Sequence, residues 1–440
     1  MSNHRIGRRT FLRGTGAAAA AVAGASVASC GGGEERDGAT GPASVGGDAR
    51  PIRLGYITPQ TGSLAPFGEA DAFVVSALEA HFAAQGLATG SGVSPVEILQ
   101  RDTGSDPATA AAAATEFVEQ EQVDLVLVSS TPDMTNPVGD VCEERGVPCI
   151  STVAPWEAWF FGRGASTVSR FRWTYHFFWG LADVQAVFMD MWDEIDTNRR
   201  AGALWPDDAD GNAWGDPATG FVPAIAERGY DIVDPGFYRN GIGDFSSLID
   251  RFLAEEAEVL VGVPIPPDFP AFWTQAADAG FRPRVATVAK ALLFPSAVEA
   301  LGDLGNNLGT EVWWSPTHPF TSSLTGQTAA ELAESYTAQS GRPWTQPIGL
   351  VHALFEVAAA ALAAADGPDD REGVVEALSR MRLDTVCGSL DWNGGPVPNV
   401  ARIPLVGGQW RLESGSPELV VVSNAQALGI PKASELQELG

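Results

Sequence analysis

The chain has 440 residues, of which 45% are apolar and 19% charged, a balance that excludes a membrane-spanning bundle and a disordered chain. At roughly 150 residues per domain, this length predicts two or three domains, each with its own core. Lysine and arginine total 27 against 55 aspartates and glutamates, a formal charge of −28, so we expect no nucleic-acid partner. Four cysteines exclude a disulfide scaffold, and five scattered histidines leave little for a metal site. We therefore expect neither a metal nor a cofactor.

Residues 1–29 have the pattern of an export signal. Arg8-Arg9-Thr10-Phe11-Leu12 precedes an uncharged Ala/Gly-rich run at 14–29, which is a positive region followed by a short apolar one. The arginine pair resembles a twin-arginine signal. The alternative is a transmembrane anchor, but about 16 residues of this composition are too short and too polar to span a bilayer.

Val27-Ala28-Ser29-Cys30 resembles the cleavage box of a lipoprotein signal peptide. In that class the cysteine becomes the acylated first residue of the mature protein. The resemblance implies a lipid anchor at Cys30 and an extracytoplasmic location, at the outer face of the cell membrane or in the periplasm. Residues 30–50 are small and polar without periodicity, which predicts a flexible tether.

From residue 51 the chain alternates between short apolar runs and helical-period stretches. The predicted strands are 52–57, 96–100, 123–128, 148–151, 201–204, 232–237, 259–263 and 285–289. The predicted helices are 67–85, 107–120, 134–145, 181–195, 217–228, 245–256, 270–279, 328–340, 348–365 and 371–380. This alternation predicts an α/β fold of right-handed βαβ units with parallel sheets. The strands are too numerous for one sheet of this kind, so we expect two.

Polar loops follow the first, third and fourth predicted strands, at 58–68, 129–132 and 151–156. In parallel sheets, ligands bind at the carboxyl ends of strands against helix N-termini. The hydroxyls and free N–H groups there favour a carboxylate or another anion. The alternative is that these serines and threonines only cap helices.

Cys142 and Cys149 lie on either side of Gly146, at a predicted helix end and the next strand. An extracytoplasmic location permits a disulfide between them. The alternative is two buried free thiols. Cys387 then has no partner and is expected to be a small core residue.

Four segments in order carry a family resemblance. They are Leu54–Pro59 with Thr61-Gly62 and 65–68, residues 124–130 with 140–151, Gly243-Asp244-Phe245-Ser246 with 259–262, and Gly388-Ser389-Leu390-Asp391-Trp392. Together they resemble the solute-binding proteins of the branched-chain amino acid family, the receptor components of ABC importers. The resemblance covers residues 51 to 428.

The resemblance implies the type I periplasmic binding protein fold, with two Rossmann-like lobes joined by three crossovers and closing like a Venus flytrap. By similarity, lobe one is 51–172 with 318–386, lobe two is 173–317 with 387–428, and 429–440 is a tail. The implied function is a monomeric receptor that delivers a small carboxylate-bearing solute, an amino acid or an aromatic or organic acid, to an ABC permease by cleft closure. The alternative is a sensor of the same fold that reports to a membrane receptor.

An enzyme is not expected, because the chain lacks a Gly-x-Ser-x-Gly elbow, a His-Glu-x-x-His motif and a Walker-type phosphate loop.

The resemblance also places ligand-binding residues. The hydroxyls that hold the ligand's anionic group in the family fall on Ser129, Ser130, Ser151 and Thr152. Lys290 occupies the position where amino-acid binders usually carry an acidic residue for the ligand's ammonium. A lysine there is expected to attract a carboxylate instead; the alternative is a solvated surface lysine.

Thirteen tryptophans against five tyrosines are unusual, and many of the aromatics follow the second ligand loop. We expect Trp156, Tyr175 and Trp214 to supply flat walls for an aromatic, cyclic or sugar-like ligand. The alternative is that they pack in the core. Asp207, Asp208 and Asp210 bind an ammonium or hydroxyls in one interpretation and are solvated turn residues in the other.

Overall fold

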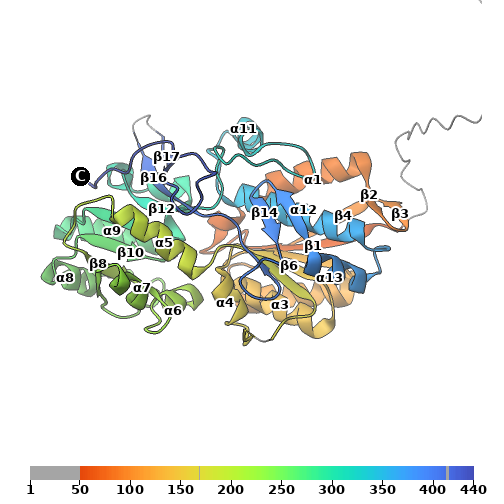
Figure 1. Ribbon diagram of the computed structural model, residues 1–440, viewed down its shortest axis with the longest axis horizontal. Coiled ribbons are helices and arrows are strands. Elements are labelled where there is room, and N and C mark those ends of the chain that lie inside the picture. Colours follow the sequence, from red (N-terminus) through yellow and green to blue (C-terminus); the bar gives the residue numbers. More distant parts are fainter. Residues whose placement is uncertain (1–49, 168, 413–415) are drawn as a thin grey trace, which may run out of the picture. The chain divides into compact units, whose positions relative to one another are not determined.

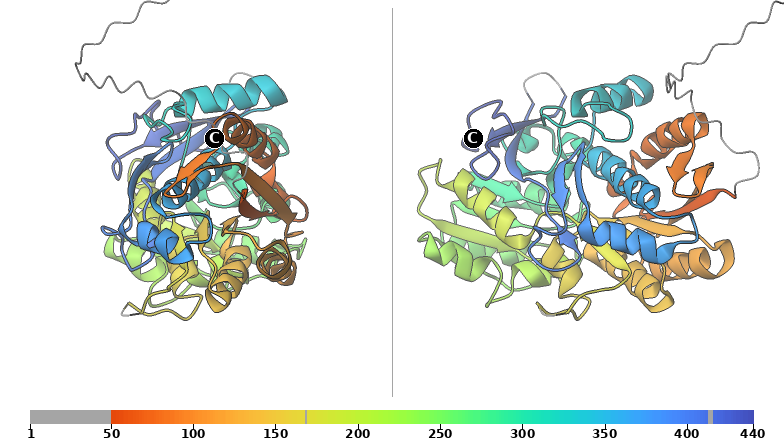
Figure 2. Two further views of the ribbon diagram at one scale, coloured as in Figure 1. Left: turned by 90° about the vertical axis from the view of Figure 1, so that its right-hand side faces the viewer. Right: turned by 45° about the vertical axis from the view of Figure 1, so that its right-hand side comes forward.

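The computed structural model describes residues 50–167, 169–412 and 416–440. The predicted export signal, the lipidation site at Cys30 and almost all of the tether lie outside the described residues. The rest of the chain forms two large sheets with helices on both faces, shown in Figure 1 and from two further directions in Figure 2. The predicted α/β fold with two parallel sheets is confirmed.

The first sheet has six strands in the order β15-β7-β6-β5-β1-β4, and every neighbouring pair is parallel. Its strands are β1 (Ile52–Thr58), β4 (Val96–Asp102), β5 (Leu125–Ser129), β6 (Cys149–Thr152), β7 (Thr174–Phe177) and β15 (Val400–Ala401). All five residues of β5, Leu-Val-Leu-Val-Ser, are buried, because helices cover both faces of a parallel sheet.

The helices around this sheet are α1 (Asp71–Gln85), α2 (Pro107–Glu116), α3 (Pro132–Arg145), α4 (Trp156–Phe160), α11 (Ala329–Ser340), α12 (Pro347–Ala364) and α13 (Arg371–Arg380). Of these, α12 is long and apolar enough to cross a membrane by length and composition, but most of it is buried inside the protein. It packs against β5 and β6, which makes it the central core helix of this half.

The second sheet has seven strands in the order β17-β16-β12-β11-β10-β8-β9. They are β8 (Arg200–Leu204), β9 (Asp231–Val233), β10 (Val259–Gly262), β11 (Val285–Val288), β12 (Gly309–Val312), β16 (Val406–Arg411) and β17 (Glu418–Ser423). The last two pair antiparallel and the others parallel. The accompanying helices are α5 (Leu181–Trp192), α6 (Ala209–Trp214), α7 (Phe221–Glu227), α8 (Ser246–Ala254), α9 (Asp268–Ala279) and α10 (Pro295–Glu299).

The chain passes between the two sheets three times: from β7 to β8, after β12, and from β15 to β16. The predicted lobe boundary at 172/173 places β7 in the second lobe, whereas β7 pairs with β6 in the first sheet, Cys149 opposite Thr174. Likewise β15 pairs with β7 rather than with the second sheet. The first crossover therefore begins after Phe177.

Among the described residues Cys142, Cys149 and Cys387 are all buried free thiols, so the alternative of two free thiols describes the pair rather than the predicted disulfide. Cys142 lies on α3 and Cys149 begins β6, and their side chains are neighbours. A hydrogen bond with Cys149, together with burial, raises the pKa of the Cys142 thiol well above its ordinary value. The sequence thus predicted the proximity of the two sulfurs but not their state.

Candidate ligand-binding site

A small cavity of about 20 Å³ lies where the carboxyl ends of strands from both sheets meet. Its lining residues are Phe67, Thr131, Val153, Pro155, Phe178, Trp179, Asp210, Trp214, Val263, Ala289, Lys290, Leu293, Glu311 and Trp313. Eight of these fourteen residues lie one or two positions after the end of a strand, as expected for a ligand site in parallel α/β sheets. We call this cavity the strand-end pocket.

Aromatic side chains form much of the wall of the strand-end pocket. Phe67 packs edge-on against Phe294, with ring centroids 4.9 Å apart, and Phe178 packs edge-on against Trp313 at 5.0 Å. Trp214 stacks on Phe221 at 4.7 Å. These contacts hold the rings in place and leave flat surfaces for an apolar or aromatic group.

Several polar atoms at the pocket are buried and have no hydrogen-bond partner among the residues that the structure describes. They are the hydroxyl of Thr131, one carboxylate oxygen of Asp210 (Oδ1) and the indole nitrogens of Trp179, Trp214 and Trp313. The hydroxyl of Ser130, next to Thr131, is in the same condition. A buried polar group without a partner costs about 1–3 kcal/mol, so this cluster has the capacity to hold the polar groups of a bound solute.

The charged centre of the pocket is Lys290, whose Nζ lies 2.9 Å from Asp208 and 2.8 Å from Asp210. Burial opposes its charge, but the two carboxylates hold the pKa of Lys290 well above its ordinary value. Burial raises the pKa of Asp210 to about 6. At neutral pH the three groups therefore carry one positive and two negative charges, a net charge of −1.

Asp208 is fully engaged inside the protein. Besides Lys290 it accepts hydrogen bonds from the backbone N–H of Gly211 at 2.9 Å and from the side chain of Asn240 at 3.1 Å. Asp210 keeps one oxygen free. Of the predicted aspartates, Asp208 and Asp210 are thus buried partners of Lys290, and Asp210 is the one that lines the pocket.

Two pocket residues have unusual backbone conformations. Lys290 has φ 59° and ψ −63°, and the N–H of Ala291 bonds to the carbonyl of Ala289 at 2.5 Å, which closes a strained γ-turn. Val153 has φ 72°, a rare value for a β-branched residue. Backbone strain of this kind is concentrated at ligand sites, where it fixes side chains in place.

Glu311, at the end of β12, is a buried acid in the pocket wall. It accepts a hydrogen bond from the Thr310 hydroxyl at 3.0 Å. Burial raises the pKa of Glu311 to about 8, so this carboxyl is mostly neutral at pH 7.

None of the four hydroxyls predicted from the resemblance, those of Ser129, Ser130, Ser151 and Thr152, is among the residues that line the strand-end pocket. Ser151 bonds to the ring of His176 (Nδ1) at 2.8 Å, and Thr152 donates to the carbonyl of Phe177 at 2.8 Å. Both belong to β6 and are bound inside the first sheet. Ser129 ends β5 beside the buried phenol of Tyr56.

The predicted aromatics also separate. Trp214 lines the strand-end pocket. Tyr175 donates from its phenol to the carbonyl of Val375 at 3.1 Å, on the α13 side of the sheet. Trp156 is half-buried in α4 and packs against Phe161.

Trp179 and Trp313 belong to the tryptophan-rich set that the sequence places near the expected cleft, but only Trp156, Tyr175 and Trp214 were expected to bind the ligand. Val153 and Glu311 were not expected at the site. Trp179 and Trp313 follow β7 and β12, two strands that the sequence pattern did not predict. A prediction of β7 and β12 would have placed Trp179 and Trp313 at the site, because residues just after parallel strands face the ligand site.

No group of three or more His, Cys, Asp or Glu side chains arranged for a metal occurs among the described residues.

Comparison with known proteins assigns the chain to a family. Residues 51–399 match the family model described as periplasmic binding protein. No protein with a curated description matches in sequence. The family match agrees with the expectation of a binding protein rather than an enzyme.

Among solved structures, a leucine binding protein, LivK, from Thermotoga maritima is similar with a TM-score of 0.69 at 18% identity, covering 85% of this chain and 99% of its own. LivJ from Streptococcus pneumoniae, in complex with isoleucine, has a TM-score of 0.68 at 18% identity, covering 85% and 100%. A solute binding protein from Rhodopseudomonas palustris, in complex with 3,4-dihydroxybenzoic acid, has a TM-score of 0.68 at 16% identity, covering 86% and 97%. At these identities the likeness shows the fold, whereas the match to the family model covers most of the chain. The chain therefore belongs to the periplasmic binding protein family.

Proposed function

We propose that this protein is the monomeric, extracytoplasmic receptor of an ABC importer, and that it binds a small solute bearing both an amine and a carboxylate in the strand-end pocket. The observation that carries the proposal is that hydrogen-bond donors and an acceptor without partners line the same pocket. The Thr131 hydroxyl and the indole N–H groups that line the pocket are donors without an acceptor. Asp210 Oδ1 is an acceptor without a donor. A carboxylate and an ammonium on one solute satisfy both kinds of group.

Thr131 also begins α3 as its N-cap residue, with Pro132 at the first helical position. The N-terminus of a helix carries a partial positive charge that favours an anion. Ser130 and Thr131 therefore bind the carboxylate in this proposal, while the hydroxyls of Ser151 and Thr152 form hydrogen bonds within the first sheet.

The charge of the Lys290 cluster supports a solute with an amine. Lys290 is already paired with two carboxylates, so the net charge of the three groups is −1. A solute with only a carboxylate raises the local negative charge further, which is costly in a buried site. An amino acid adds no net charge and places its ammonium beside Asp210.

Similar structures support the carboxylate part of the proposal. They include a leucine binding protein, a complex with isoleucine, and complexes with 3,4-dihydroxybenzoic acid and 4-hydroxybenzoate, of which the two benzoates carry no amine. Each of those compounds joins a carboxylate to an apolar or aromatic body. The aromatic walls here suit an amino acid with an apolar or aromatic side chain.

A thermal-shift panel on residues 31–440 tests the proposal. It contains the branched-chain and aromatic amino acids, their amine-free keto acids, and hydroxybenzoates. A ligand at 100 times its dissociation constant stabilises by about 2.7 kcal/mol, a clear rise in melting temperature. Stabilisation by amino acids supports the proposal. Stabilisation by amine-free acids alone, or by no member of the panel, overturns it.

We also propose that the chain is exported through a twin-arginine signal and anchored by acylation of Cys30. The support is the sequence Arg8-Arg9-Thr10-Phe11-Leu12 followed by Val27-Ala28-Ser29-Cys30. Replacing Cys30 with Ala is expected to move the protein from the membrane fraction to the soluble fraction after export. Replacing Arg8 and Arg9 with Lys is expected to block export altogether. Retention of the Cys30→Ala protein in membranes would argue for an uncleaved anchor.

A further inference from the structure

Two of the three crossover segments bring a tryptophan into the strand-end pocket. Trp179 lies between the end of β7 in the first sheet and the start of α5, which leads to the second sheet. Trp313 follows β12 of the second sheet, where the chain returns toward α11 and α12. Both residues line the pocket.

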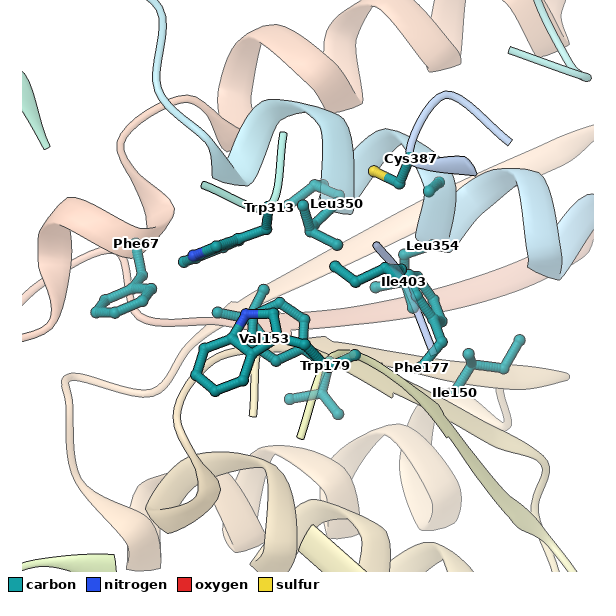
Figure 3. Packing of buried hydrophobic residues seen from close by; sticks show 14 of the residues in the cluster. Phe67, Ile150, Val153, Phe177, Trp179, Trp313, Leu350, Leu354, Cys387 and Ile403 are labelled. Atoms are coloured by element: carbon teal, nitrogen blue, oxygen red, sulfur yellow. The ribbon is translucent and has the colours of Figure 1, made fainter. Parts of the chain in front are cut away.

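The two indoles are buried, with 3% of Trp179 and 1% of Trp313 exposed, and neither ring nitrogen has a hydrogen-bond partner of good geometry among the described residues. Burial raises the pKa of Glu311, and the Trp313 side chain lies close enough to that carboxyl to lower the pKa in part. Figure 3 shows both rings beside the same space, next to Phe67 and Val153, with the ring nitrogen of Trp313 directed toward Phe67. Phe178 packs against both tryptophans, with ring centroids 4.9 Å from Trp179 and 5.0 Å from Trp313. The two crossover segments are thus in contact at the pocket wall.

We propose that the indole N–H groups of Trp179 and Trp313 bind an oxygen of the ligand, so that the crossover segments themselves recognise the solute. This inference rests on the proposed function and assigns two of its indole donors, both on crossover segments, to the ligand's oxygens. An indole nitrogen is a donor only, so each of these groups requires an acceptor such as a carboxylate or carbonyl oxygen. Lys290, the one cation in the lining, is already paired with Asp208 and Asp210. The neutral donors Thr131, Trp179 and Trp313 therefore recognise the ligand's acceptor oxygens.

This arrangement joins ligand binding to the movement between the sheets. Hinge motions in two-lobed binding proteins occur in the few residues that connect the lobes. A ligand held by Trp179 and Trp313 contacts those connecting residues directly. It stabilises one backbone arrangement of both segments, and its differential affinity for that arrangement drives closure.

Trp314 supplies a matched control in the same crossover. Its indole nitrogen is also buried and without a partner, but it does not line the pocket. Its ring packs instead against Trp344, with centroids 6.0 Å apart, and against Gly349 of α12. A tryptophan-to-phenylalanine change at 314 removes the same N–H group away from the ligand.

The test combines calorimetry with the variants Trp179→Phe, Trp313→Phe and Trp314→Phe, and L-leucine and L-phenylalanine as probes. We expect the two pocket variants to bind roughly ten- to a hundredfold more weakly than the wild type, and Trp314→Phe to bind within twofold of it. At saturating probe, small-angle scattering should show a smaller change in radius of gyration for the pocket variants. Equal affinities for the wild type and both pocket variants overturn the inference while leaving the proposed function intact. Failure of the wild type to bind either probe overturns both.

A second measurement does not depend on how the variants fold. In ¹⁵N-tryptophan spectra of the wild-type protein, adding the probe should shift the indole signals of Trp179 and Trp313 and leave that of Trp314 in place. The variants serve only to assign the signals. Unchanged signals from Trp179 and Trp313 at saturation overturn the inference.

Discussion

The side chain of Lys290 is committed to two carboxylates of its own chain, and this changes what the residue contributes to recognition. From sequence, a lysine at this position is expected to attract a ligand carboxylate. In the structure Asp208 and Asp210 lie within 3 Å of its Nζ, and the cluster is left one charge negative. The presence of Lys290 therefore predicted where the charged centre lies but not that its net charge is negative. The net charge depends on Asp210 and Asp208, which lie 80 and 82 positions away in the chain.

At the same scale, Thr131→Val tests the carboxylate-binding hydroxyl. Valine keeps the shape of threonine and removes a buried donor that has no partner in the described part of the chain. We expect affinity for the bound amino acid to fall ten- to a hundredfold, about 1–3 kcal/mol, in calorimetric titration. Ser151→Ala is the control: its hydroxyl bonds to His176, so affinity should hold while stability falls by about 1 kcal/mol. Wild-type affinity in Thr131→Val would remove this hydroxyl from the site.

The raised pKa of Glu311 predicts how the stability of the protein depends on pH. Burial raises its pKa from 4.5 to about 8, so between these values the folded protein binds a proton that the unfolded chain has lost. Stability from this group therefore falls as pH rises from 4.5 to 8. Glu311→Gln lacks the titration, and its melting temperature relative to the wild type should increase steadily from pH 5 to pH 8.5. A difference that stays constant over this range would contradict the raised pKa.

At the scale of elements, the long helices were predicted more accurately than the short, fully buried strands. The helices predicted at 328–340 and 371–380 are observed at Ala329–Ser340 and Arg371–Arg380. In contrast β7 and β12 were not predicted. Each has four residues, all buried, so neither shows the alternation that marks a half-buried strand.

The position where β6 ends also explains why only part of the pocket could be predicted. The fourth strand was predicted to end at 151, but β6 extends to Thr152. This extension turns the hydroxyls of Ser151 and Thr152 into the sheet and makes Val153 the first residue at the pocket. Thr131, Trp214 and Lys290 follow strands that were predicted, and they do reach it.

The packing of α12 on the second crossover gives a prediction for an element. A Cβ at Gly349 would lie 2.3 Å from the ring of Trp314. Gly349→Ala should therefore destabilise the protein by about 1–3 kcal/mol through overpacking, although alanine favours a helix by about 1 kcal/mol. Chemical denaturation measures the change. Trp314→Leu makes room for the methyl group, so the double variant should be more stable than the sum of the two single changes. Strictly additive effects would show that the two residues do not meet.

For the whole molecule, the dominant feature is its negative charge, 55 acidic against 27 basic residues. Like charges on one folded chain repel one another, and dissolved salt screens the repulsion. We expect the melting temperature to rise between 0.05 M and 1 M NaCl. Sucrose at matched osmolality is the control for effects unrelated to charge. A melting temperature that falls with NaCl would mean that the ion pairs outweigh the net repulsion.

The central claim is that the strand-end pocket binds a solute that carries an amine, held next to Asp210. The most direct measurement is calorimetric titration of the wild type and Asp210→Asn with the most stabilising amino acid and with its amine-free keto acid. We predict that the wild type binds the amino acid at least tenfold more tightly than the keto acid, and that Asp210→Asn narrows this difference. Equal or tighter binding of the keto acid by the wild type would contradict the claim.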